Sequence, residues 1–208
     1  MKQNKIITIA RQFGSGGKNV AKMVAEQLGI PFYDKDLIAL AAKESGLSAA
    51  LFEGIEEKPT NSLLYSLVMG IQSGRGAMYQ YGDALNTDGV FRIQSQVIRD
   101  VADKGSCVIV GRCSDYILRE QENLVNVFVH ADEDWRIKRV MELYDLSEKE
   151  ARNTVTKTDS RRSSFYNFYT NKVWGDLKNY NLTIDSSQVG IERAADIIVS
   201  YAKMAFDE

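Results

Sequence analysis

The stretch ITIARQFGSGGKN, residues 7–19, joins an apolar run to a glycine-rich segment and a lysine. The apolar run begins at Ile6, and unbroken hydrophobicity of this kind is typical of a strand buried on both faces of a parallel sheet. Glycines allow backbone N–H groups to converge on an anion, and a helix that follows presents its own unpaired N–H groups. The stretch therefore predicts a strand, a phosphate-binding loop and a helix. A glycine-rich turn without a ligand is the alternative.

The loop departs from the usual phosphate-loop pattern, GxxxxGK(S/T). When Gly17 and Lys18 are matched to the GK pair, Gln12 stands where a glycine is expected and Asn19 stands where Ser or Thr is expected. In the usual loop the lysine reaches the β- and γ-phosphates, and the hydroxyl holds magnesium. The residues alone therefore indicate an anion site and leave its use of ATP open.

Four more apolar runs predict further strands, at residues 30–33, 107–111, 126–130 and 182–185. Between these runs, apolar residues repeat at helical spacing. Gly29 follows the first helical pattern as a stop signal, and Ser147 and Glu150 have the spacing of a capping box. Strands that alternate with helices predict a three-layer α/β/α domain with a five-stranded parallel sheet.

Two segments interrupt this alternation within an expected single domain of residues 1–208. Residues 47–104 contain no convincing strand, and their apolar positions suit helices. We interpret them as a helical insertion on the α/β core and as a candidate homodimer surface. Residues 156–175 are rich in basic, hydroxyl and aromatic side chains, and we interpret them as a mobile, lid-like segment.

The composition narrows the class of protein. A net charge of -2 gives no broad basic surface for a nucleic acid. Two cysteines and one histidine are too few for a disulfide framework or a metal cluster, and His130 is expected to be structural. No run of about 18 apolar residues suggests a membrane span. We expect a cytoplasmic protein whose partner is a nucleotide or another small phosphorylated molecule.

Four stretches resemble segments of bacterial cytidylate kinases. Residues 7–34 resemble their start, where a strand, a GxxGxGKGT loop and a helix precede a short strand ending in Asp. Residues 108–118, VIVGRCSDYIL, resemble their GRDIGT strand and loop, and residues 127–142 resemble a strand with an arginine-rich helix. Residues 157–166, KTDSRRSSFY, lie where those kinases carry a lid with an Asp-x-x-Arg element. The best match is a cytidylate kinase-like family with FGSGG and GRC in these places.

The resemblance covers almost the whole chain and implies a P-loop fold of the nucleoside monophosphate kinase superfamily. Such an enzyme transfers the γ-phosphate of ATP, with Mg²⁺, to CMP or a related small acceptor. Two other functions stay open. One is a nucleotide- or anion-binding protein of the same fold without turnover, and the other is a kinase for a different acceptor.

An ungapped alignment through the first helix assigns the loop residues. Gly17 falls at the position of the family's lysine, Lys18 falls one place later, Asn19 falls at its magnesium-binding Thr, and Arg11 replaces its first glycine. The resemblance implies phosphate contacts from Arg11, Gly14, Ser15, Gly16, Gly17, Lys18 and Asn19. Lys18 is the candidate catalytic cation. Asn19 offers an amide oxygen to Mg²⁺ in place of the hydroxyl.

Two strand ends supply further candidates. Arg112 follows Gly111 at the carboxyl end of a predicted strand, and the resemblance implies that it holds the acceptor nucleotide. Asp34 ends another strand and is a candidate for positioning Mg²⁺ or the acceptor. Val110 and Cys113 stand where the family carries acidic residues around its GR pair, so the identity of the base stays open.

The remaining candidates come from the later part of the chain. Asp159 and Arg162 have the Asp-x-x-Arg spacing of the lid, and Arg161 is a second arginine that could close over phosphates. Arg136 is a candidate nucleotide contact. A solvated helix face is the alternative for the residues near 160, and a surface ion pair is the alternative for Arg136.

Overall fold

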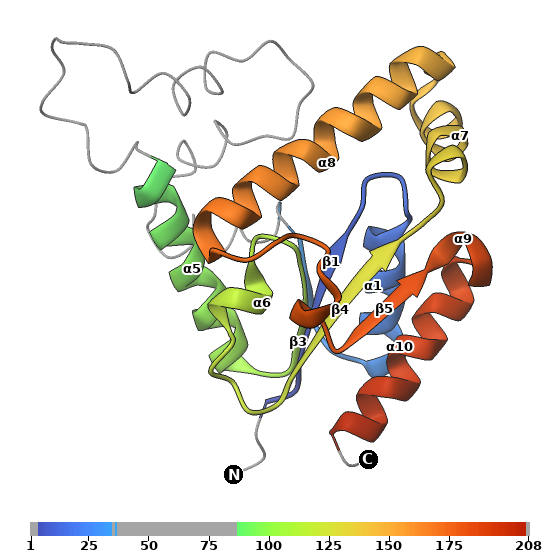
Figure 1. Ribbon diagram of the computed structural model, residues 1–208. Helices are drawn as coiled ribbons and strands as arrows, with labels where there is room; N and C mark the ends of the chain where they lie inside the picture. The colour runs from blue at the N-terminus through green and yellow to red at the C-terminus, as the bar shows by residue number, and fades with distance from the viewer. Residues whose placement is uncertain (1–3, 35, 37–86, 207–208) are drawn as a thin grey trace, which may run out of the picture.

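The computed structural model describes residues 4–34, 36 and 87–206, and its strands form one five-stranded parallel sheet. The strand order is β2-β3-β1-β4-β5, with β1 (Ile6–Arg11) in the centre. The neighbours of β1 are β3 (Cys107–Val110) and β4 (Leu124–His130), and the edge strands are β2 (Phe32–Tyr33) and β5 (Leu182–Asp185). Each strand expected from the sequence is present, so the predicted fold is confirmed (Figure 1).

The parallel pairing brings all carboxyl ends of the strands to one edge of the sheet. The central strand β1 pairs with β3 on one side and with β4 on the other. The chain passes from β3 to β4 across β1, so the strand order reverses there. Open α/β sheets bind ligands in the crevice at such a reversal. The sheet therefore positions a site at the end of β1, beside the ends of β3 and β4.

Helices cover both faces of the sheet, which gives three layers (Figure 1). On one face α1 (Gly17–Leu28) and α10 (Ile191–Ala205) pack together against the strands. On the other face lie α5 (Thr87–Lys104) and α6 (Ser114–Ile117). The side chains of β1 supply both cores, since Ile7 and Ile9 face α1 while Ile6 faces α5.

Two predicted helix boundaries are confirmed. Gly29 adopts a left-handed conformation after α1, and its N–H and that of Ile30 return to carbonyls of the last turn. Ser147 and Glu150 form a complete capping box at the start of α8 (Glu148–Thr170). These local signals fix where α1 and α8 lie along the chain.

The region interpreted as a helical insertion is described only at its end. Residues 87–104 form α5, whose Val97, Ile98 and Val101 are buried against the sheet. This helix therefore belongs to the layer that covers the core. Residues 47–86, which make up most of the proposed insertion and dimer surface, lie outside the described residues.

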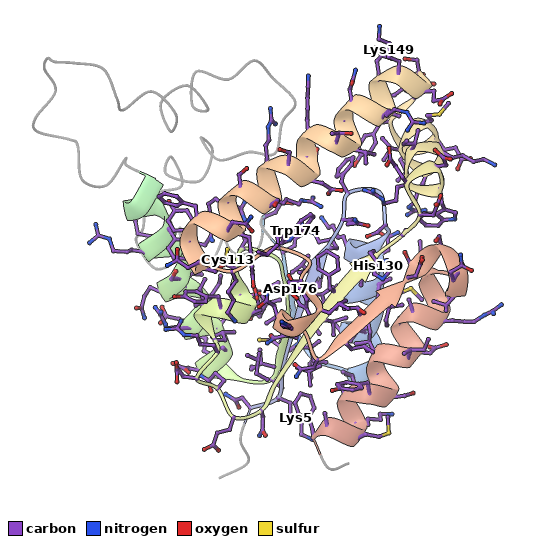
Figure 2. All side chains as sticks on the ribbon, in the orientation of Figure 1. Lys5, Cys113, His130, Lys149, Trp174 and Asp176 are labelled. Atoms are coloured by element: carbon purple, nitrogen blue, oxygen red, sulfur yellow. The ribbon has the colours of Figure 1, made fainter. Side chains whose placement is uncertain are left out.

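Helices α7 (Glu133–Tyr144) and α8 pack against each other and extend beyond the carboxyl edge of the sheet (Figure 1). Residues 156–170 of the proposed lid are the second part of α8, and residues 171–175 lead towards η1 (Leu177–Asn179). Figure 2 shows Lys149 at the outer end of α8 and Trp174 just past the other end. Along the part of the chain that the structure describes, no helix has the length and apolar character to cross a membrane.

Candidate functional site

The loop between β1 and α1 is shaped by two glycines in left-handed conformations. Gly14 has φ +81° and Gly16 has φ +76°, which glycine adopts without steric cost. A Cβ on Gly14 would lie 2.9 Å from the carbonyl oxygen of Arg136, and one on Gly16 would lie 2.7 Å from Ile191 Cδ1. The backbone conformation therefore favours glycine at both positions, and at Gly14 a backbone atom also leaves no space for a Cβ.

Ser15 holds the turn of the loop from inside. Its buried hydroxyl donates to the Gln12 carbonyl at 2.9 Å and accepts from the Gly17 amide at 3.3 Å. Its own carbonyl accepts a hydrogen bond from Ser186 Oγ at 2.7 Å. Ser186 is the first residue of α9 (Ser186–Val189), so the loop is tied to the end of β5.

The amino end of α1 is the part of the loop suited to an anion. Gly16 is its N-cap residue and provides no side-chain cap. The amides of Lys18 and Asn19 belong to the first turn and have no partner within the helix. Such an end combines free N–H groups with the positive end of the helix dipole. The exposed Asn19 side chain lies at the same end.

Phe13 in the loop is held through both of its backbone polar groups. Its N–H donates to Asp159 Oδ1 at 2.7 Å, and its carbonyl accepts from Arg136 Nη1 at 3.2 Å. Arg136 Nη1 also lies 2.6 Å from Asp159 Oδ2, and Arg136 Nε donates to the Ala131 carbonyl at 3.1 Å. Burial raises the pKa of Asp159, while the Phe13 amide and Arg136 act to lower it. The buried Arg136 thus pairs with α8, and both side chains position the loop.

Arg162 and Arg161 lie one turn further along α8. Arg162 Nη1 donates to the Arg11 carbonyl at 3.2 Å, and its guanidinium lies 5.5 Å from the centre of the Phe13 ring. Both arginines are partly buried. The structure therefore brings Asp159 and Arg162 to the loop, and it sets Arg161 next to them on the same helix.

Lys18 reaches the end of β2. Its Nζ lies 2.6 Å from Asp34 Oδ2 and 4.0 Å from Asp36 Oδ2. Asp34 is buried and accepts the Asp36 amide on its other oxygen at 3.0 Å. The hydrogen bond to Asp34 raises the pKa of Lys18, so the ammonium stays charged. Two predicted catalytic residues thus form one ion pair at the edge of the sheet.

The side chain of Arg11 occupies space between two glycines. A Cβ on Gly17 would lie 2.5 Å from Arg11 Cβ and 3.0 Å from Arg11 Cγ. A Cβ on Gly111 would overlap Arg11 Nη1. The side chain therefore runs from the first residue of α1 to the carboxyl end of β3.

The turn after β3 is strained. Gly111, Arg112 and Cys113 have consecutive φ values of +70°, +59° and +55°. Residues other than glycine rarely adopt this backbone conformation. The Gly111 amide donates to the Ile9 carbonyl at 3.0 Å, and Gln94 Nε2 donates to the Arg112 carbonyl at 3.3 Å. Strain of this kind concentrates at functional sites. The turn holds Arg112 at the end of β3, next to β1.

Cys113 is a buried thiol in this turn. Burial and the nearby Asp115 raise its pKa, against a smaller lowering by Arg112. The thiol is therefore protonated at neutral pH, and it lacks the thiolate that nucleophilic or metal-binding cysteines need.

A buried polar pair beneath the site was not anticipated from the sequence. Tyr166 of α8 donates its hydroxyl to Asp115 Oδ2 of α6 at 2.6 Å, and both side chains are buried. Burial raises the pKa of Asp115, against the hydrogen bond from Tyr166. The sequence shows that Asp115 follows Arg112 by three positions. It does not indicate that Asp115 pairs with Tyr166, because the two residues are 51 positions apart.

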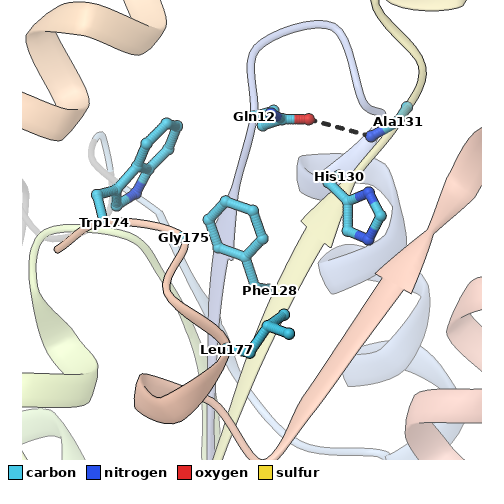
Figure 3. A pocket seen from close by; sticks show the side chains of 7 residues that line it. All are labelled: Gln12, Phe128, His130, Ala131, Trp174, Gly175 and Leu177. Atoms are coloured by element: carbon cyan, nitrogen blue, oxygen red, sulfur yellow. Dashed lines mark hydrogen bonds between the residues drawn. The ribbon is translucent and has the colours of Figure 1, made fainter.

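A pocket of about 420 Å³ opens beside the loop (Figure 3). Three of its lining residues carry rings, and the full set is Gln12, Phe128, His130, Ala131, Trp174, Gly175 and Leu177. Gln12 Oε1 accepts the Ala131 amide at 3.2 Å, which fixes the loop to the end of β4. Aromatic walls next to this glycine-rich loop suit a planar ring.

The side chains that could hold a metal are few. Among residues 4–34, 36 and 87–206, no three His, Cys, Asp or Glu side chains gather into a metal-binding group. Asp34 supplies a carboxylate at the edge of the sheet, and Asn19 supplies an amide oxygen on α1. One or two protein oxygens are the usual contribution to a Mg²⁺ that arrives with substrate phosphates. The donor set fits such an ion.

The chain is similar to one protein family and to several known proteins. A model of the cytidylate kinase-like family matches residues 6–188. A cytidylate kinase from Aeropyrum pernix is 26% identical over 195 residues, which cover 91% of this chain and 94% of that protein.

Solved structures show the same fold. An uncharacterised protein from Eubacterium ventriosum is 32% identical, with a TM-score of 0.71 over 96% of this chain and 98% of that one. The shikimate kinase of Bacteroides thetaiotaomicron is 13% identical, with a TM-score of 0.53 over 96% and 98% of the two chains. The sheet and its helices therefore match a kinase fold.

Proposed function

Because the chain belongs to the cytidylate kinase-like family, we propose that it is a phosphotransferase of the nucleoside monophosphate kinase type. It transfers the γ-phosphate of ATP to CMP or a related small acceptor. One observation carries the proposal: a glycine loop leads into an uncapped helix at the end of the central strand, with cationic side chains around it. Phosphoryl transfer needs mainly positioning and charge neutralisation, which these groups supply.

The loop binds the phosphates of ATP through its backbone. The amides of Lys18 and Asn19, in the first turn of α1, donate to phosphate oxygens, and the dipole of α1 adds to this attraction. The shape of the loop is maintained by Arg136 and Asp159 at Phe13. These two residues therefore act on ATP indirectly, as positioning residues.

The acceptor binds on the side of β3 and β2. Arg112 offers a guanidinium at the strained turn, and its fork of donors suits two oxygens of a phosphate. The ion pair of Lys18 and Asp34 lies at the end of β2, which pairs with β3. Arg162 of α8 donates to the Arg11 carbonyl at the start of the loop. In this proposal Arg162 and its neighbour Arg161 neutralise charge on the phosphate in transfer.

Asn19 and Asp34 are the residues that would hold Mg²⁺. When bound, the ion neutralises phosphate charge and fixes the orientation of the phosphates. Asp34 shares its carboxylate with Lys18, so the ammonium and the ion compete for the same oxygens.

A second candidate is a protein that binds nucleotide without transferring phosphate. Gly17 and Asn19 replace the lysine and hydroxyl of the usual loop, which favours this function. Val110 and Cys113 also lack the acidic contacts expected for a cytosine base, and the protonated Cys113 thiol does not replace them.

A coupled assay of ADP formation separates the two functions. The protein is incubated with ATP, Mg²⁺ and one nucleoside monophosphate at a time. Turnover that depends on one acceptor supports the kinase, and Arg112→Ala should then raise the KM for that acceptor roughly tenfold or more. Binding is followed by the fluorescence of Trp174 at the pocket, after Trp135→Phe removes the other tryptophan. A fluorescence response to ATP without ADP from any acceptor supports the binding protein.

A further inference from the structure

We propose that Arg11 supplies the phosphate-binding cation that phosphate loops normally carry at the position of Gly17. The inference deepens the proposed function and rests on it, since it identifies the side chain that neutralises the transferred phosphate. It also explains how a loop without the usual lysine retains a cation at its centre.

Relative to the usual phosphate loop, a large and a small residue have exchanged positions between the end of β1 and the start of α1. In the usual loop the residue at the end of the strand is glycine, and the first residue of the helix is lysine. Here the strand ends in Arg11 and the helix begins with Gly17. Arg11 Cβ lies 2.5 Å from the place where a Gly17 Cβ would be, so the stem of the arginine fills the space in which a lysine stem would begin.

The second observation is the direction of the guanidinium. Arg11 Nη1 lies against Gly111, where any Cβ would overlap it. Gly111 precedes Arg112 at the end of β3, the strand next to β1. The positive charge therefore lies between the ATP loop and the acceptor side, which is where the transferred phosphate must pass.

A third observation fixes the backbone of Arg11. Its carbonyl accepts a hydrogen bond from Arg162 Nη1 at 3.2 Å, so α8 holds the end of β1 in place. A guanidinium has five N–H donors, and it can contact a phosphate while it keeps other partners.

Lys18 is placed differently. Its ammonium forms an ion pair with Asp34 at the end of β2, an edge strand of the sheet. The pKa of Lys18 is raised mainly by its hydrogen bond to Asp34, and the charge of Arg11 opposes this rise only weakly. Arg11 stands at the central strand and Lys18 towards the edge, so Arg11 is the cation nearer to the phosphate path.

The exchange predicts a specific coupling between positions 11 and 17. Gly17 does not have a positive φ, so its backbone accepts a side chain once Arg11 is shortened. Gly17→Lys alone should collide with Arg11, and Arg11→Gly alone should lack a cation. The double variant, Arg11→Gly with Gly17→Lys, rebuilds the usual arrangement and removes the two closest atoms. Val129 Cβ, at 3.3 Å, is a further neighbour of the new Cβ.

The test measures ADP formation and ATP binding for the wild type, both single variants and the double variant. We expect each single variant to lose roughly 100-fold or more in kcat/KM, and the double variant to recover to within roughly tenfold of the wild type. A double variant that folds but is no more active than either single variant would overturn the proposal. Circular dichroism and thermal unfolding report on folding.

Two further variants keep the test decisive if the double variant does not fold. Arg11→Lys retains the charge and should lose much less activity than Arg11→Ala. Lys22→Ala removes an exposed α1 lysine that pairs with Glu26, and it should change neither activity nor binding. Equal activity of Arg11→Ala and wild type contradicts the proposal.

The measurement of ATP binding tests the role of Arg11 separately from kinase activity. If the wild type binds ATP but forms no ADP, the kinase assignment fails while Arg11 is still tested by ATP titration. Arg11→Ala should then weaken ATP binding roughly tenfold or more. Unchanged affinity, or a wild type that binds no ATP, overturns the role of Arg11.

Discussion

Arg136 and Asp159 form a 2.6 Å ion pair that holds both backbone polar groups of Phe13. The pair joins α7 and α8 to the glycine loop and is largely shielded from water, with side-chain exposures of 8% and 16%. Its two members are 23 residues apart in the chain. The conformation of the loop therefore depends on the α7–α8 pair, and loosening that pair should disturb phosphate binding.

Replacing Asp159 by Asn should destabilise the protein and weaken ATP binding together. The amide can still accept the Phe13 N–H, but Arg136 is left buried without its counter-charge. Breaking a buried pair in this way costs about 3 kcal/mol or more. Urea unfolding measures the loss. The control is Arg152→Ala, which removes exposed ion pairs from α8 to Glu133 and Asp134 of α7 and should have little effect. Equal losses for both variants would contradict a special role of the buried pair.

Gly14→Ala should impair the loop more than Gly29→Ala impairs the end of α1. Both glycines have positive φ, so each alanine should lower the free energy of unfolding by about 1–2 kcal/mol through backbone strain. At Gly29 a Cβ meets no atom within 4 Å, whereas at Gly14 it meets the backbone oxygen of Arg136 at 2.9 Å. We expect Gly14→Ala alone to reduce ATP binding. The prediction fails if the two variants lose the same stability and both bind ATP normally.

Asp115→Asn should change how stability depends on pH. Burial raises the pKa of Asp115 above its ordinary value of 3.8, so the folded state holds the proton more tightly than the unfolded state. Stability linked to this group is therefore present at low pH and is lost as pH rises through the raised pKa. The variant keeps an acceptor for Tyr166 and does not titrate.

Thermal unfolding of both proteins from roughly pH 4 to pH 8 checks this sign. The melting temperature of the variant, relative to the wild type, should increase with pH across the lower part of this range. Parallel curves would show that Asp115 does not titrate differently in the folded and unfolded states.

Asp34→Asn should increase the Mg²⁺ concentration needed for half-maximal ADP formation, by roughly tenfold. The change removes the charge of a buried carboxylate at the strand end and weakens its pairing with Lys18. Asp36→Asn is the matched control, because its carboxylate is 69% exposed and lies 4.0 Å from the same ammonium. A Mg²⁺ requirement that shifts equally in both variants would argue against Asp34 as the metal-side residue.

The fold could be predicted because its signals are local. Each buried strand is a short apolar run, Gly29 ends α1, and Ser147 with Glu150 begins α8. The glycine loop could be predicted in the same way, since the positive φ angles of Gly14 and Gly16 are typical of glycine. Such features depend on neighbours in the sequence.

The partners within the site could not be predicted in this way. Arg136 carries no sign that it pairs with Asp159 rather than with Asp132 or Glu133. Nothing near Lys18 indicates that it reaches Asp34, and nothing near Arg11 indicates that Gly17 and Gly111 make room for it. These contacts arise only when strand ends meet across the sheet.

The most direct test of phosphotransfer is to identify both products of the reaction by ³¹P NMR. ATP, Mg²⁺ and an acceptor monophosphate, beginning with CMP, are followed with the wild-type protein and with Arg11→Ala. We expect equal amounts of ADP and acceptor diphosphate with the wild type, and a strongly reduced rate with Arg11→Ala. Failure of every monophosphate to gain a phosphate, under conditions where ATP binds, would contradict phosphotransfer.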